Sequence, residues 1–235
     1  MTCVYAYMIL VAVLCEAPPT ETAREGEQPS PATSARLESL AKIGIETALS
    51  FLLETRTTVE RVRLDPAAEV LELDRLRIAN PKGFDADAPA FSAQRVRVEA
   101  RPDVLFSPKA VIRLVEVEGG TVHAQMKIRR GLNLKRLLDS VTRFNAPRLL
   151  GEKRWIVEKG IMTDCLLRFA SDWPPRTYEY PLEPMELSMK GLGGRGVTAD
   201  KAVAEVLLRL IEAIQEANRA QLQEFSGALS SRESR

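Results

Sequence analysis

The residues that could act as catalysts or metal ligands are few in this chain and stand apart from one another. His123 is the only histidine, and it alternates with Thr121, Gln125 and Lys127 along an extended run. This period of two predicts an imidazole on the polar face of a strand. No second histidine exists to complete a metal site with it. We therefore expect a solvated side chain and not a general base.

Cys165 is the next candidate, because a thiolate is a strong nucleophile. It lies in an apolar run with Leu166 and Leu167, which favours a buried, inert thiol. Cys3 and Cys15 belong to the N-terminal leader, so the body of the chain holds no second cysteine for a disulfide. We expect the chain to have no enzymatic activity, no cofactor and no metal site.

A glycine-rich segment at 191–196 precedes a predicted helix, as phosphate-binding loops do. Its spacing fits neither G-x-G-x-x-G nor G-x-x-x-x-G-K-[ST], and no βαβ unit surrounds it. It therefore predicts a flexible hinge. Lys127, Arg129 and Arg130 form a small basic cluster, which predicts a solvated edge, with contact to lipid headgroups as the alternative.

Composition excludes one class of partner. The chain has 235 residues, 45% of them hydrophobic, so it can bury a core of ordinary size. Its 33 Lys and Arg residues nearly balance its 32 Asp and Glu residues. This balance lacks the basic footprint of a nucleic-acid binder, and we expect no nucleic acid as a partner.

The N-terminus predicts export. An apolar run at 4–14 has the length of a signal-peptide core and is too short to span a bilayer. The signal is atypical, because no basic residue precedes the run and Pro18 follows Ala17. Lipidation at Cys15, an apolar helix end and a misassigned start are the alternatives. The expected location is the bacterial periplasm or envelope.

The predicted domain organisation follows from composition. Residues 1–17 form the predicted signal peptide, and 18–33, rich in Pro, Glu, Thr and Ser, form a disordered linker. A single domain at 34–226 and a disordered tail at 227–235 complete the chain.

Three helices are predicted in this domain. The first begins at Ser34 as its N-cap and carries an apolar stripe, with Glu38, Lys42, Glu46 and Ser50 on the opposite side. Asn133 caps a short central helix. Thr198 caps a long C-terminal amphipathic helix that covers the sheet, a membrane-surface helix being the alternative. Its packing residues are Val203, Leu207, Leu210 and Ile214.

Strands with short connections fill 57–128, which predicts antiparallel neighbours, because no crossover of sufficient length intervenes. A change of phase at Asp74 and Arg75 predicts a bulge. Gly119 and Gly120 predict a tight hairpin. A second block of strands follows the central helix at 155–189, where Pro181 and Pro184 predict an edge or irregular strand.

One turn follows the alternating strand 70–78. Asn80 can accept a local backbone hydrogen bond, Pro81 presets φ, Gly83 closes the corner and Phe84 returns an apolar group to the core. These residues predict a structural type I turn.

The turn, the run "VIRLVEVEGG", Val157 to Gly160 after the central helix, and the closing "ADKAVAEVLLRLIEAI" together resemble short AsmA-like envelope proteins. That family is related to the bridge-like lipid-transfer class. The resemblance covers about residues 43–217. It implies an envelope protein with a curved antiparallel sheet, whose apolar face shields acyl chains in the large relatives.

The expected fold class is therefore α+β, a curved antiparallel sheet with an N-terminal helix, a short central helix and a long C-terminal amphipathic helix. The first functional hypothesis is a non-enzymatic exported protein that binds lipid acyl chains on its apolar sheet face. Its partner is then phospholipid or a membrane surface. The alternative is a structural or adaptor module that binds an envelope protein and carries no lipid. Two amphipathic helices are available to cover the apolar face of the sheet, so the fold alone does not decide between these two functions.

Overall fold

The computed structural model describes residues 31–100, 109–143, 154–173 and 175–233. The predicted signal peptide, almost all of the predicted linker and the last two residues lie outside this range. Three α-helices and one short 3-10 helix occur in the described residues: α2 (Pro31–Leu53), α3 (Asn133–Arg143), α5 (Ala199–Glu233) and η2 (Leu192–Gly194). None of the described helices is both long enough and apolar enough to cross a membrane.

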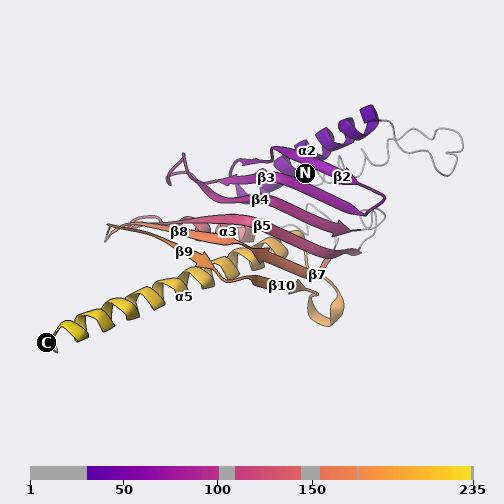
Figure 1. The fold of residues 1–235 in the computed structure, drawn as a ribbon. Helices are drawn as coiled ribbons and strands as arrows, with labels where there is room; N and C mark the ends of the chain where they lie inside the picture. The colour runs from indigo at the N-terminus through magenta and orange to yellow at the C-terminus, as the bar shows by residue number, and fades with distance from the viewer. Residues whose placement is uncertain (1–30, 101–108, 144–153, 174, 234–235) are drawn as a thin grey trace, which may run out of the picture.

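Ten strands form one open, curved sheet in the described residues (Figure 1). The path across the sheet is β1-β3-β4-β5-β7-β10, and β2, β6, β8 and β9 pair with members of it. The strands are β1 (Thr57–Thr58), β2 (Arg61–Asp65), β3 (Val70–Ala79), β4 (Pro89–Ala100), β5 (Lys109–Lys127), β6 (Gly131–Leu132), β7 (Arg154–Thr163), β8 (Cys165–Asp172), β9 (Pro175–Leu182) and β10 (Met185–Met189).

This architecture confirms the predicted α+β class with its N-terminal, central and C-terminal helices. Strands β1 to β5 pair only antiparallel with one another, as their short connections predict. The sheet is nevertheless mixed, because β5 lies parallel to β7 and β8. The chain between β5 and β7 contains α3 and supplies the long return path that a parallel neighbour requires.

A single crease crosses the sheet. The register that pairs β1 with β3 continues through β2, and the same continuity joins β7 to β8 and β10 to β9. Each of these pairs is therefore one long strand that is interrupted at the crease. The residues that face one another along it, strand by strand, are Glu60, Arg75, Gln94, Gly119, Asp164 and Glu183.

Three of the six positions on the crease have a left-handed backbone. The φ angles are +52° at Arg75, +62° at Gly119 and +52° at Asp164. In β3 this irregularity lets Leu73 and Leu76 both point into the core, which is the predicted change of phase. β4 makes a matching change beside it, so the register of the pair is the same on both sides of the crease.

The predicted hairpin at Gly119 and Gly120 is wrong. β5 runs without a turn through both residues. Gly119 supplies the positive φ of the crease, and an ideal Cβ on Gly120 would lie only 2.6 Å from Cys165 Sγ. The two glycines thus allow a local bend and a close approach within one strand.

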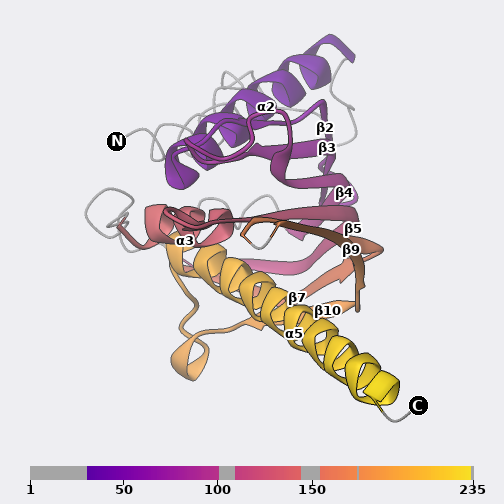
Figure 2. The ribbon, with the colours of Figure 1, turned by 90° about the vertical axis from the view of Figure 1, so that its left-hand side faces the viewer.

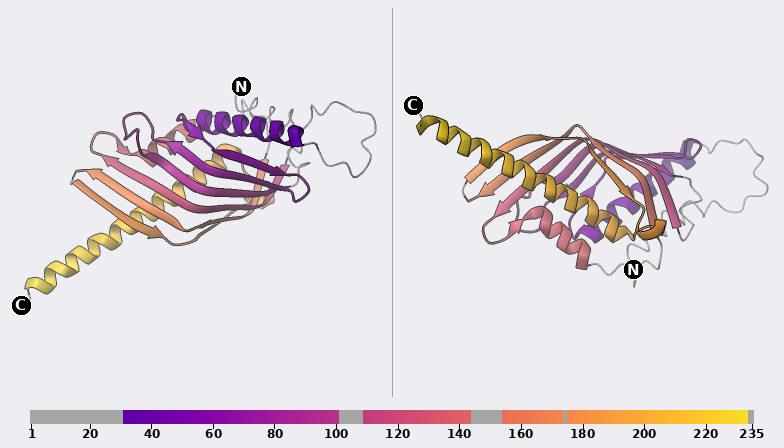
Figure 3. Two further views of the ribbon diagram at one scale, coloured as in Figure 1. Left: turned by 45° about the horizontal axis from the view of Figure 1, so that its top comes forward. Right: turned by 90° about the horizontal axis from the view of Figure 1, so that it is seen from below.

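All three helices cover the same face of the sheet (Figures 2 and 3). Near β1 to β4, Ala41 of α2 joins a core cluster with Val62, Leu73 and Val96. The larger cluster unites α3 and α5 with β5, β7 and β8. Its buried helix residues include Leu134, Leu137, Val141, Leu207, Leu210 and Ile214, and Val203 packs against it partly exposed.

The opposite face of the sheet is charged. Arg63 donates two hydrogen bonds to the Asp74 carboxylate at 2.8 and 2.9 Å, and Arg95 pairs with Glu72. Arg97 pairs with Glu99 at 2.8 Å. The sheet therefore has one apolar face, covered by helices, and one face of exposed ion pairs.

Helix α2 differs from its prediction in two ways. It begins at Pro31, which suits the first turn of a helix, so Ser34 is not the N-cap. Its polar stripe does not face solvent alone, but bonds the free backbone edge of β1 and β2. Thr57 N–H donates to Ser50 Oγ at 2.8 Å, Val59 N–H to Glu46 Oε1 at 2.7 Å, Lys42 Nζ to Glu60 O at 3.1 Å, and Leu64 N–H to Glu38 Oε1 at 3.3 Å.

Helix α5 begins after Thr198, as predicted, and the Ala202 N–H donates to Thr198 O at 3.0 Å. The buried Thr198 hydroxyl has no hydrogen-bond partner in the described residues, so its side chain does not form the expected cap. The helix continues to Glu233, through the segment predicted as a disordered tail.

Candidate functional site

The turn after β3 lies one residue later than predicted. Phe84 N–H donates to Pro81 O at 3.2 Å, so Lys82 and Gly83 occupy the two central positions. Gly83 has φ +94°, and a positive φ at the second central position defines a type II turn. The type I prediction is therefore wrong. Phe84 is buried, with 8% of its surface exposed.

Asn80 acts mainly through its side-chain amide. Its Nδ2 donates to Asp85 O at 3.0 Å and to Ala88 O at 2.8 Å, which braces the loop between β3 and β4. Its Oδ1 accepts a 2.6 Å hydrogen bond from Asn133 Nδ2. The predicted local backbone acceptor role is wrong, because the oxygen is used by a distant side chain.

Asn133 is the completely buried centre of this region. Its Oδ1 accepts from Leu134 N–H and from Gln125 N–H, both at 2.9 Å. Its Nδ2 also donates to His123 O at 2.6 Å. The residue predicted as a simple helix cap therefore joins the start of α3, the end of β5 and the turn after β3.

The predicted basic cluster also contacts this turn. Lys127 Nζ donates to Gly83 O at 3.2 Å and lies 5.9 Å from the centroid of the Phe84 ring. Arg130 Nη1 donates to Lys82 O at 3.2 Å. Two of the three basic residues thus hold the carbonyl groups of the turn, and the prediction of a merely solvated edge is wrong for them. Arg129 is exposed.

Gly83 leaves the space that Arg130 occupies. An ideal Cβ on Gly83 would fall 1.4 Å from Arg130 Nη1. A side chain there would displace the guanidinium and would also adopt a strained φ. The glycine is therefore required by the positive φ of the turn, whereas the flexible Arg130 side chain can move aside.

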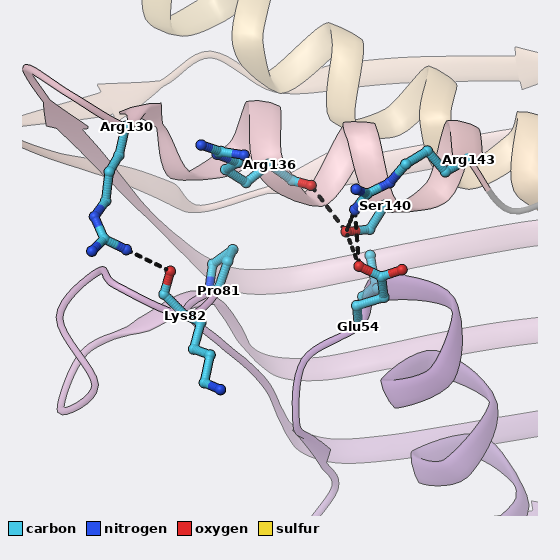
Figure 4. A pocket seen from close by; sticks show the side chains of 8 residues that line it. Glu54, Pro81, Lys82, Arg130, Arg136, Ser140 and Arg143 are labelled. Atoms are coloured by element: carbon cyan, nitrogen blue, oxygen red, sulfur yellow. Dashed lines mark hydrogen bonds and ion pairs between the residues drawn. The ribbon is translucent and has the colours of Figure 1, made fainter.

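A cavity of about 370 Å³ lies between this turn, the end of α2 and α3 (Figure 4). Glu54 follows α2 with φ +52° and accepts hydrogen bonds from Ser140 Oγ at 3.0 Å and from Arg143 Nη2 at 2.9 Å. The complete lining is Leu53, Glu54, Pro81, Lys82, Arg130, Arg136, Ser140 and Arg143.

The cavity is basic. Four of its lining residues are cationic, and Glu54 is the one carboxylate among them. Arg143 is paired with Glu54, and the Lys82 ammonium points away from α3 (Figure 4). The guanidinium of Arg136 makes no hydrogen bond within the described residues. This arrangement can attract an anion.

The sequence candidates for catalysis do not meet here. Burial lowers the pKa of His123, and neighbouring Arg168 lowers it further, while Asp85 and Glu179 raise it. Cys165 is buried, and that burial raises the pKa of its thiol. The Cys165 Sγ lies 3.4 Å from Thr163 O. The described residues contain no group of three or more potential metal ligands.

The glycine-rich segment forms a closed turn. Gly196 N–H donates to Lys190 O at 2.8 Å, and Val197 and Trp155 exchange two backbone hydrogen bonds. An ideal Cβ on Gly191 would lie 2.4 Å from Gly196 O. The N–H groups of Gly194, Arg195 and Gly196 are thus bonded to nearby carbonyl groups, unlike those of a phosphate-binding loop.

In the sequence, Asn80, Gly83 and Asn133 are the residues that indicate this region. Sequence reasoning missed Glu54, Arg136, Ser140 and Arg143. Glu54 follows α2 and the other three lie on α3, and this spacing carries no motif.

Comparison with known proteins adds no relative. No family model, no curated protein and no solved structure matches the chain.

Proposed function

We propose that this chain is a non-enzymatic, exported module of the cell envelope that acts as a structural element or adaptor and carries no acyl chain on its sheet. The resemblance of its turn and helices to short AsmA-like proteins supports the envelope assignment. The covered apolar face of the sheet supports the adaptor role.

The covered face is the observation that carries the proposal. Leu207 is 7% exposed, Leu210 4% and Ile214 3%, and they join one core cluster with sheet residues such as Val122 and Leu167. An acyl chain on the same face would have to displace α3 or α5. Displacing either helix would remove several leucine-sized side chains from the core. Because truncating one such side chain costs about 2 to 5 kcal/mol, the loss of their burial opposes this displacement.

Lipid extraction and native mass spectrometry of protein purified from a bacterial envelope fraction test this role. We expect a protein without stoichiometric phospholipid, and a partner protein recovered after crosslinking in the envelope. Co-purification of one or more phospholipids per chain would reject the adaptor role in favour of acyl-chain binding.

A second candidate function is contact with an anionic membrane surface. Ile128 and Trp173 are each 71% exposed, and they follow the paired ends of β5 and β8. Arg129 and Arg130 come directly after Ile128. Exposed apolar groups beside basic ones suit the membrane interface.

Cosedimentation with vesicles measures this second function. We expect binding to vesicles that contain phosphatidylglycerol, and loss of binding in Ile128→Ser combined with Trp173→Ser. Equal vesicle binding by the wild type and this variant would exclude Ile128 and Trp173 as a membrane contact.

A further inference from the structure

The two edges of the sheet are protected to different degrees. Along β1 and β2, four side chains of α2 bond the free backbone groups. At the other edge, β10 pairs only with β7. In the part of the chain that the structure describes, no helix or loop bonds the backbone of Met185–Met189 as α2 bonds β1 and β2. Alternate residues of an edge strand turn their N–H and C=O groups outward, so β10 presents unpaired groups.

Proline interrupts this edge between β9 and β10. Pro181 is near the end of β9, and Pro184 lies between β9 and β10. Neither has an N–H to donate to an added strand. Met185–Met189 contains no proline. A five-residue stretch therefore remains able to pair.

A groove of about 540 Å³ runs beside this stretch, between β10 and α5. Figure 2 shows α5 passing alongside β10. Leu182, Met185, Leu187 and Ala213 supply its apolar part. An added strand would place alternate side chains in this groove, because successive residues of a strand point to opposite faces.

The rim of the groove is acidic. Glu183, Glu186, Glu212 and Glu216 line it, against the single cation Arg209. Arg209 is already paired with Glu205 at 3.3 Å and with Glu212 at 3.4 Å. Glu186 lies 3.8 Å from Lys159 Nζ, whereas Glu183 and Glu216 make no ion pair in the described part of the chain. The groove therefore favours a cationic occupant.

We propose that β10 accepts an extended, basic segment of a partner protein as an added strand. The segment would pair with the outer backbone groups of Met185–Met189. Its lysine or arginine side chains would lay their aliphatic stems on the groove and bring their charges to the carboxylates. This inference names the partner chemistry of the adaptor role and rests on that proposed function.

Three synthetic ten-residue peptides test the proposal on the full chain. The first alternates lysine with valine or threonine, the second replaces each lysine with glutamate, and the third repeats the first with alternate backbone amides N-methylated. We expect the first to bind by calorimetry and to slow hydrogen exchange at the amides of Met185–Met189. The acidic and N-methylated peptides should bind at least about tenfold more weakly, a difference of about 1.4 kcal/mol.

A charge-reversal pair isolates the groove. Glu183→Lys combined with Glu216→Lys should weaken the basic peptide about tenfold, since two attractive charges become repulsive. Asp87→Lys combined with Asp172→Lys makes the same change of net charge at two exposed positions, one in the loop between β3 and β4 and one at the end of β8, and should leave binding unchanged. Circular dichroism verifies that both variants fold, and exchange on the wild-type chain decides the question if either does not.

Several results would overturn the proposal. Equal binding of the N-methylated peptide would show attraction by charge without strand addition, and equal binding of the acidic peptide would remove the charge argument. Dimerisation through β10 in sedimentation experiments would show that a second copy of this chain, and not a basic partner segment, pairs with this edge. Absence of peptide binding rejects the edge site alone, whereas co-purified phospholipid rejects the adaptor role alone.

Discussion

The Nδ2 of Asn133 donates a 2.6 Å hydrogen bond to Oδ1 of Asn80, which joins the first residue of α3 to the residue after β3. Asn133 is completely buried and bonds three further backbone groups. We expect Asn133→Ala to lower the free energy of unfolding by about 2 to 4 kcal/mol, because buried N–H and C=O groups lose their partner. Urea denaturation gives this value.

The Asn80–Asn133 pair is tested by a double-mutant cycle with Asn80→Ala. A coupling of about 1 kcal/mol is expected for two side chains in one hydrogen-bond network. Lys135→Ala, on the exposed side of α3, is the control and should change stability little. Strict additivity of the two asparagine variants would show that the pair is not energetically linked.

Gly83 should resist substitution for a backbone reason. With φ at +94°, Gly83→Val is expected to cost about 1 to 3 kcal/mol, the range for a strained backbone. Adding Arg130→Ala to the Gly83→Val chain should restore only the part of the lost stability that comes from the clash with the guanidinium. The thermal midpoint is measured together with the binding of phospholipid or of a partner protein. Lost binding with an unchanged midpoint would make the turn a contact site and contradict its structural role.

Docking of α5 on the core gives a further expectation. Leu210 is 4% exposed, so Leu210→Ala should destabilise the domain by about 2 to 5 kcal/mol. Leu208, on the same helix and 43% exposed, supplies the control Leu208→Ala, which should have a much smaller effect. Identical denaturant midpoints for both variants would mean that α5 is undocked in solution.

The edge role of α2 predicts a difference between two substitutions at Glu46. Glu46→Ala leaves the Val59 N–H without its acceptor and should cost about 1 kcal/mol, with faster hydrogen exchange at Val59. Glu46→Gln keeps an oxygen in the same place and should retain most of the protection. If exchange at Val59 is the same in both variants, the side chain does not protect this edge.

Local patterns account for much of the fold, and contacts between distant segments account for the rest. The period of α5 and the prolines at 181 and 184 predicted a packed helix and an edge strand, because these features act within a few residues. The glycines at 119 and 120 misled, since a hairpin and a crease both require a permissive backbone. Only the neighbouring strands decide between them, and the sequence does not state which strands are neighbours.

The basic cavity shows the same limit more strongly. Its lining comes from the end of α2, the turn after β3, the turn after β5, and α3. Asn133 was recognised as a cap, because capping is local, but its bond to Asn80 depends on how β3 and β5 lie in the sheet. The polar stripe of α2 has a helical period whether it faces water or a strand edge.

The crease itself offers the last test. Arg75 holds φ +52°, a conformation that costs a non-glycine residue about 1 kcal/mol or more. Its ion pair with Glu60, at 2.7 Å, joins side chains that are 73% and 57% exposed, and such pairs contribute little. Arg75→Gly should therefore stabilise the domain or leave it unchanged. Arg77→Gly, two residues along the same strand and outside the positive-φ positions, should destabilise it by up to about 1 kcal/mol. Thermal and urea unfolding of the two variants decide the matter. Equal losses would show that the left-handed geometry at Arg75 is absent in solution, and with it the crease that aligns the breaks between β1 and β2, β7 and β8, and β9 and β10.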